Sequence, residues 1–159
     1  MDFKEYVKLA MRTNAEGKSF KDNITNGIFG LVGETAELLE ELRIGNTENI
    51  INELGDVYWY TALLFHTTGM VPTPTTFDKN MSIVTCVGDI TDHFKKHFFQ
   101  GHELDSDYMN WKLSVLKRLL DDLAGALTSA EDVMTRNIEK LKRRFPDGFD
   151  VDKSINREE

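Results

Sequence analysis

The spacing of hydrophobic residues along the chain favours an all-α protein. Hydrophobic residues recur every three or four positions through most of the sequence, which is the period of one face of an α-helix. Stretches that alternate hydrophobic and polar residues, as half-buried strands do, are scarce. The pattern predicts six helices, over about residues 2–13, 22–43, 47–67, 79–99, 106–127 and 129–145.

Residues typical of helix ends and loops separate these segments. Gly45 follows the second helix, where a glycine commonly ends a helix. The sequence TTGMVPTPTT at 67–76 contains two prolines and predicts an exposed loop between two halves of the chain. We therefore expect one domain over 1–150, which is long enough to bury a core, and a frayed tail over 151–159.

The two halves of the chain share a short phrase. VGETAE at 32–37 is echoed by VGDITD at 87–92, and each phrase precedes a turn and a further helix. This favours two degenerate copies of one helical hairpin, over about 20–68 and 79–145. In the second phrase the two glutamates are shortened to aspartates, and in the best gapped match ELGD of the first half aligns with WKLS of the second, so the second half has lost the set of four acids. A chance likeness between two amphipathic helices is the alternative.

Two pairs of carboxylates adjoin the hydrophobic stripes of the second and third helices. These four acids are Glu34, Glu37, Glu53 and Asp56. Residues three apart on a helix lie about 60° from each other, so antiparallel packing of the two helices brings the pairs face to face. Four neighbouring carboxylates repel one another unless they are solvated, protonated or neutralised by a cation. Oxygen ligands of this kind suit Mg²⁺, whereas the alternative is a solvated helix flank.

These residues also carry a resemblance to a known family. GLVGETAELLEE followed by NELGDVYWY resembles the MazG-like, all-α nucleoside triphosphate pyrophosphohydrolases, whose signature is Glu-x-x-Glu on one helix and Glu-x-x-Asp on the next. The four acids fill both pairs, although Gly33 stands where the longer signature has another Glu. Tyr60 matches an aromatic residue one turn after the last acid. EDVMTRNIEKLKRRFPDGF is similar to the family's closing phrase, in which Asn137, Lys140 and Arg144 match its polar positions.

The resemblance implies a fold, a reaction and a set of roles. The fold is a MazG-like helical bundle with a four-helix core, which the two halves of one chain can form. The reaction is Mg²⁺-dependent hydrolysis of nucleoside or deoxynucleoside triphosphates to the monophosphate and pyrophosphate, as nucleotide-pool housekeeping, with Mn²⁺ as a substitute. The four acids hold the metal and one glutamate deprotonates the attacking water. Substrate is bound by Tyr60, Asn137, Lys140 and Arg144.

The sequence also allows an alternative function and an association between copies of the chain. The degraded second half allows a catalytically silent helical module that binds nucleotide or regulates a partner, although the intact set of acids argues against it. A self-contained bundle can also associate through its outer faces, and we expect a homodimer. Glycines 33 and 55, each next to an acid, favour close approach of backbones at these positions.

Composition excludes several other classes of protein. The net charge of −8 argues against a surface for polymeric nucleic acid, which is held mainly by clustered Lys and Arg. The longest hydrophobic runs are too short to cross a bilayer, and the N-terminal residues lack a signal-peptide pattern, so we expect a cytoplasmic protein. The lone Cys86 is expected in the core. Spacing four between His93 and His97 suits zinc, but no third ligand is nearby. The tryptophans are assigned to the core or an interface rather than to base stacking.

Overall fold

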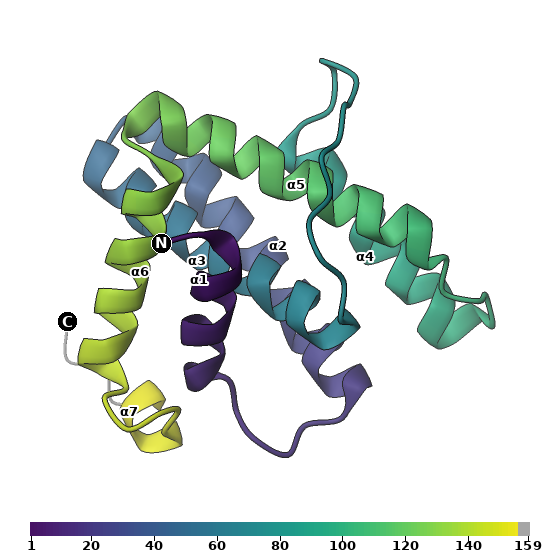
Figure 1. Cartoon of the computed structure of the whole chain (residues 1–159), viewed down its shortest axis with the longest axis horizontal. Coiled ribbons are helices and arrows are strands. Elements are labelled where there is room, and N and C mark those ends of the chain that lie inside the picture. Colours follow the sequence, from purple (N-terminus) through teal and green to yellow (C-terminus); the bar gives the residue numbers. More distant parts are fainter. Residues whose placement is uncertain (156–159) are drawn as a thin grey trace.

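The computed structural model, which describes residues 1–155, contains helices and no strand within that range (Figure 1). Its elements are α1 (Phe3–Ala10), the 3₁₀-turn η1 (Met11–Thr13), α2 (Phe20–Ile44), α3 (Thr47–Thr68), α4 (Ile83–Gln100), α5 (Ser106–Leu127), α6 (Ala130–Arg144) and α7 (Val151–Ile155). The all-α prediction is therefore confirmed.

Helix ends coincide with residues that satisfy free backbone groups. The side chain of Ser19 accepts a hydrogen bond from the backbone N–H of Asp22, and Asp22 reaches back to Ser19, so α2 begins two residues before the predicted start. Asn46 caps α3 by accepting from the N–H of Asn49. Gly45 ends α2 with a φ of +83°, a left-handed conformation that side chains other than glycine rarely adopt.

Helices α2 to α5 form a four-helix bundle. The hairpin α2–α3 packs against the hairpin α4–α5 through contacts of α3 with α5 and of α2 with α4. Two glycines of α2 bring it close to α3: a Cβ on Gly27 would lie 2.7 Å from Leu64, and one on Gly30 would lie 2.1 Å from the ring of Tyr60. The buried stripes of the two helices, including Leu31 and Leu54, meet between them. The four-helix core predicted from the resemblance is present.

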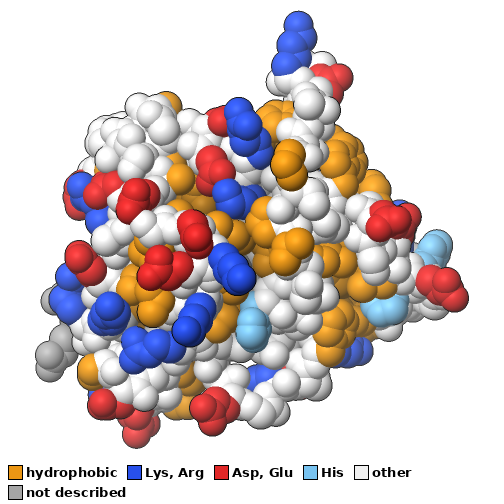
Figure 2. All heavy atoms as spheres, viewed as in Figure 1, with side chains coloured by type: hydrophobic (Ala, Val, Ile, Leu, Met, Phe, Trp, Pro, Cys, Tyr) orange, Lys and Arg blue, Asp and Glu red, His pale blue; other side chains and the backbone are white. Residues whose placement is uncertain are grey.

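Helices α1 and α6 lie side by side and cover one side of α3 (Figure 1). Both contact α3 and each other, and α6 also contacts α5. On the face drawn in Figure 2, acidic and basic side chains are interspersed around these two helices. This layer matters for the site because it brings the C-terminal part of the chain against the third helix.

The loop between the two hairpins is longer than predicted. Helix α4 begins at Ile83 rather than near 79, because Ser82 and Thr85 form a capping box there. The backbone N–H of Thr73 donates to the hydroxyl of Ser114 at 3.1 Å, which ties the loop to α5. Cys86 is fully buried, as expected. Among the described residues, no helix is both long and apolar enough to span a membrane.

The C-terminal segment includes one short element that the sequence did not predict. Helix α7 (Val151–Ile155) lies within the expected tail, and Asp150 accepts a hydrogen bond from the N–H of Lys153 in its first turn. The rest of the predicted tail, residues 156–159, lies outside the described residues.

Candidate functional site

Three carboxylates from α2 and α3 converge where the two helices face each other. Glu34, Glu37 and Glu53 each place one oxygen within 4.8 Å of the others. Glu34 and Glu53 are partly buried, whereas Glu37 is exposed. The structure thus brings together acids from both predicted pairs, at a spacing at which one cation can contact several of them.

Asp56, the fourth predicted acid, is bound by side chains from α6. The ammonium group of Lys140 donates to both carboxylate oxygens of Asp56, at 2.6 Å to Oδ1 and 2.5 Å to Oδ2. The amide nitrogen of Asn137 donates to Oδ1 at 2.9 Å. Side-chain exposure is only 16% for Lys140 and 24% for Asp56, so this ion pair is largely shielded from water. Two of the residues that resemble the family's closing phrase therefore lie at the acidic site.

Tyr6 of α1 holds Asn137 in the orientation in which Asn137 donates to Asp56. It is fully buried, and its hydroxyl donates to Oδ1 of Asn137 at 2.8 Å. An ionised carboxylate can only accept hydrogen bonds, so Asn137 must turn its nitrogen to Asp56 and its oxygen to Tyr6. Burial, and then the charge of Asp56, raise the pKa of the Tyr6 phenol well above its usual value, which keeps it a donor.

Burial and then mutual repulsion raise the pKa values of two acids in the cluster, so that protons or cations are favoured there. Burial raises the pKa of Glu34 to about 7, and the charges of Asp56, Glu37 and Glu53 add to this effect, while Lys140 opposes it. Burial and the charges of Asp56 and Glu37 likewise raise the pKa of Glu53. A nearby cation would favour the ionised form of these carboxylates, because opposite charges attract.

One further acid extends the cluster along α2. Oxygen Oε2 of Glu41 is buried and has no hydrogen-bond partner among the described residues. The charge of Glu41 also contributes to the raised pKa of Glu53, so the two carboxyl groups are close. An unpaired buried carboxylate oxygen beside three converging carboxylates fits a divalent cation, because such ions take oxygen ligands.

Tyr60 and Arg144 occupy different positions relative to these acids. The ring of Tyr60 lies over Gly30, in the space that a side chain at that position would fill, and it meets the indole of Trp59 edge-on at 4.8 Å between centroids. Arg144 is exposed in the last turn of α6. It forms no ion pair with any described carboxylate, so the structure does not join it to the Asp56 group.

The two glycines next to the acids behave differently. A Cβ on Gly55 would lie 3.0 Å from the Cβ of Asn137, so this glycine allows α6 to approach α3 closely. A Cβ on Gly33 would meet nothing within 4 Å, and the residue is exposed. The expectation of close backbone approach is confirmed at Gly55 and wrong at Gly33, because the side of α2 that carries Gly33 faces solvent.

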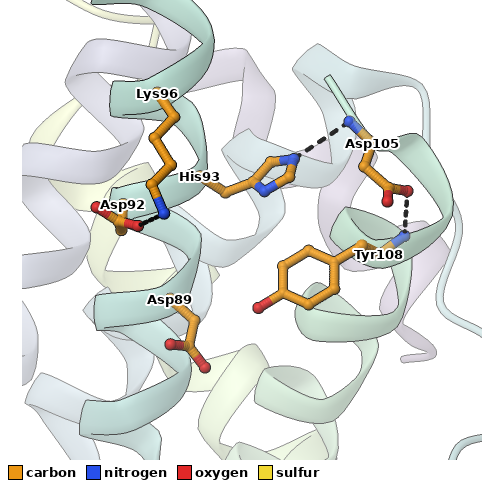
Figure 3. Close-up of a pocket in the computed structure, with 6 residues that line it drawn as sticks. All are labelled: Asp89, Asp92, His93, Lys96, Asp105 and Tyr108. Carbon is orange, nitrogen blue, oxygen red and sulfur yellow. Dashed lines mark hydrogen bonds and ion pairs between the residues drawn. The ribbon is translucent and has the colours of Figure 1, made fainter. Parts of the chain in front are cut away.

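In the second hairpin, lysines pair with the acids that echo the first pair, and Figure 3 shows the pair of Lys96 with Asp92. Asp89 accepts from the ammonium group of Lys112 at 2.6 Å, and Lys96 pairs with Asp92 at 2.7 Å. Lys112 is 4% exposed and aligns with Leu54 in the gapped match of the two halves. These acids border a pocket of about 390 Å³. Their charges are already compensated, so this hairpin lacks the free carboxylates of the first.

The histidines and tryptophans make internal contacts. Nε2 of His93 accepts from the backbone N–H of Asp105 at 3.2 Å (Figure 3), and Nδ1 of His97 lies 2.9 Å from the carbonyl oxygen of His102. Both rings thereby hold the loop between α4 and α5. The indole N–H of Trp59 donates to the hydroxyl of Thr13 at 3.0 Å, which ties α3 to η1.

The fold and the site define an all-α helical bundle in which three carboxylates converge, a set of oxygen donors that suits a divalent cation. Within this bundle, residues 24–80 match the family model described as the MazG nucleotide pyrophosphohydrolase domain. The match covers all four signature acids and Tyr60, and over this segment it supports the resemblance to MazG-like proteins. This family suggests nucleotide pyrophosphohydrolase activity. Comparisons with curated proteins and with solved structures gave no match.

Three residues of the site lie outside the matched segment. Asn137 and Lys140 were identified from the resemblance of the closing phrase, whereas Tyr6 was not identified from the sequence at all. A buried tyrosine on an amphipathic helix has no local pattern that separates it from an ordinary core residue. Its role depends on contact with a residue 131 positions away.

Proposed function

We propose that the chain hydrolyses nucleoside or deoxynucleoside triphosphates to the monophosphate and pyrophosphate, with Mg²⁺ as its cofactor and Mn²⁺ as a substitute. One observation carries this proposal: Glu34, Glu37 and Glu53 converge within 4.8 Å in the hairpin that matches the MazG family model. Removal of unwanted triphosphates from the nucleotide pool is the role that follows from such a reaction.

Four carboxylates would hold the metal, namely Glu34, Glu37, Glu53 and Asp56. Glu41 extends the same row of acids, and its buried, unpaired oxygen supports the presence of a cation. A bound divalent cation supplies neutralisation of phosphate charge and activation of water. The carboxylates themselves orient that cation, and one of the glutamates accepts a proton from the attacking water.

The C-terminal helix would provide the contacts to phosphate. Lys140 carries its ammonium group at the edge of the acidic cluster, where it can stabilise charge on phosphate oxygens. Asn137 keeps Asp56 oriented through its amide nitrogen, and Tyr60, one turn after Asp56 on α3, is assigned to contact with the substrate. Arg144, one turn beyond Lys140 on α6, is assigned to the outer phosphates.

Pyrophosphate release from a panel of nucleoside and deoxynucleoside triphosphates, with Mg²⁺ and with Mn²⁺, tests the proposal. Glu53→Gln should abolish the release, because it removes a carboxylate from the centre of the cluster. Glu48→Gln is the matched control, since Glu48 lies on the same helix, is exposed and pairs with Arg136. Undiminished turnover in Glu53→Gln would refute the assignment. Thermal stabilisation by nucleotide and Mg²⁺ without any turnover would favour the silent binding module.

We also propose that the chain forms a homodimer through α2. Support comes from a row of exposed hydrophobic side chains on this helix, Phe29, Val32 and Leu39, of which Phe29 is 73% exposed. Their spacing of three and seven residues places them on one side of the helix. A surface of this kind is commonly covered by a second protein surface.

A further inference from the structure

The ammonium group of Lys140 lies against the carboxylate of Asp56, in the position that a bound metal cation would take. The ammonium group contacts both carboxylate oxygens, and Oδ2 of Asp56 has Lys140 as its hydrogen-bond partner, while Oδ1 also accepts from Asn137. Asp56 is the one signature acid outside the group of three converging carboxylates. A metal ion that used Asp56 would therefore have to displace the lysine.

We propose that Lys140 and a divalent cation are alternative partners of Asp56, so that the site takes up the cation tightly only together with a polyphosphate that receives the displaced lysine. This inference rests on the proposed function, because it assumes that the acids hold a metal. The ligand it names is a metal–triphosphate complex that binds as a unit, in preference to free metal or free nucleotide.

The first reason is electrostatic. An ammonium group next to a divalent cation is repelled by it, and in a site shielded from water this repulsion is only weakly screened. Lys140 then needs a new anionic partner, and the carboxylates that remain are engaged with the metal. The oxygens of a bound polyphosphate provide that partner.

The second reason is that the exchange requires little movement of the fold. Tyr6 is fully buried and Asn137 is 3% exposed, and their hydrogen bond holds α6 against α3. Gly55 allows the two helices to stay in close contact at this point. The flexible four-carbon stem of Lys140 can turn away while Asn137 continues to donate to Oδ1 of Asp56.

The affinity for Mn²⁺ without nucleotide tests the inference, because removal of Lys140 should increase this affinity. Titration calorimetry at pH 8.5 compares the wild-type chain with Lys140→Met. If the lysine competes with the metal, Lys140→Met binds Mn²⁺ about five- to tenfold more tightly, the change expected when one partly shielded ion pair is removed. Lys142→Met is the matched control, because Lys142 is exposed on the same helix and has no described carboxylate partner, and its affinity should stay unchanged.

A second measurement examines the coupling to nucleotide. A triphosphate analogue with a non-hydrolysable α–β bridge should bind the wild-type chain more tightly when Mn²⁺ is present, and by linkage should tighten Mn²⁺ binding equally. In Lys140→Met this mutual enhancement should fall at least threefold, because the lysine no longer changes partners. Lys142→Met should keep the wild-type enhancement.

The outcomes separate this inference from the proposed function. Unchanged or weaker Mn²⁺ binding in Lys140→Met overturns the inference, even if the wild-type chain hydrolyses nucleotides. A failure of all three proteins to bind Mn²⁺ overturns it as well. Tighter Mn²⁺ binding in the variant, with no pyrophosphate release by the wild type, upholds the competition and refutes the activity. If Lys140→Met does not fold by circular dichroism, Lys140→Gln replaces it and the same signs are expected.

Discussion

The hydroxyl of Tyr6 lies 2.8 Å from the amide oxygen of Asn137 and donates a hydrogen bond to it across 131 residues of sequence. The other end of the same amide donates to Asp56, so a single side chain joins α1 to the acids of α3. A core residue in the first helix thus determines the orientation of a group at the site.

Replacing this tyrosine by phenylalanine should destabilise the fold. Tyr6→Phe leaves the amide oxygen of Asn137 buried without its donor, which costs about 1–3 kcal/mol in the free energy of unfolding. Urea denaturation measures this change. Tyr108→Phe is the control, because Tyr108 is only partly buried and its hydroxyl has no described hydrogen bond, so its effect should stay within about 0.5 kcal/mol. Equal effects of the two changes would argue against the role of Tyr6.

Alanine at the two glycines beside the acids should act with opposite signs. Gly55→Ala places a methyl group 3.0 Å from the Cβ of Asn137, so it separates α6 from α3 and lowers the free energy of unfolding by about 1–3 kcal/mol. Gly33→Ala meets open space on an exposed helix position, so it should raise that free energy by about 0.5–1 kcal/mol. Denaturation of both variants tests the pair, and destabilisation by Gly33→Ala would contradict the open surface on α2.

Stability without metal should fall as the pH rises through the titration of Glu34. Its pKa is raised from 4.5 to about 7 in the folded chain, so between these values the folded state binds more protons than the unfolded state. The free energy of unfolding must then decrease with increasing pH over this window. Denaturation between pH 4.5 and 8 should show the decrease, and Glu34→Gln should reduce its slope.

The matched control for this pH dependence is Glu40→Gln. Arg43 lowers the pKa of Glu40, so this residue titrates below the window and its replacement should leave the slope unchanged. Because the pKa of Glu53 is also raised, Glu34→Gln should keep a residual decrease of stability with pH. A divalent cation that binds the same carboxylates should abolish this residual decrease. A slope that is equal in wild type and Glu34→Gln would show that another group is responsible.

The proposed dimer makes a prediction about the outer side of α2. Phe29→Asp places a charge in the exposed hydrophobic row and should shift the chain to monomer in size-exclusion chromatography with light scattering. Val71→Asp introduces the same charge at another exposed hydrophobic residue, in the loop after α3, and should leave the molecular mass unchanged. A wild-type chain that is monomeric at high concentration would refute the proposal.

The sequence predicted those features that depend on neighbouring residues. Helix period, the end of α2 at Gly45, and the placement of acid pairs on helix margins all follow from spacings of a few residues. Helix α4 begins later than predicted because Ser82 and Thr85 form a capping box that fixes its first turn, although hydrophobic residues precede it. The short helix α7 was missed because its few residues carry too little periodicity to be distinguished from a tail.

Features that depend on contacts between distant segments could not be derived from spacing. The pairing of Lys140 with Asp56 joins residues 84 positions apart, and only the resemblance to a family pointed to Lys140 at all. The contrast between Gly33 and Gly55 depends on which side of each helix another helix covers. A residue's neighbours in sequence do not carry that information.

The ion pair between Lys112 and Asp89 shows that the two hairpins differ in the source of the positive charge that balances their acids. In the second hairpin the compensating positive charge is part of the polypeptide, so it is synthesised with the chain and is held in place by burial. In the first hairpin, under the proposed function, most of that charge would come from a metal ion taken up from solution. On this proposal, a chelator would change the charge balance of the first hairpin and leave that of the second unchanged.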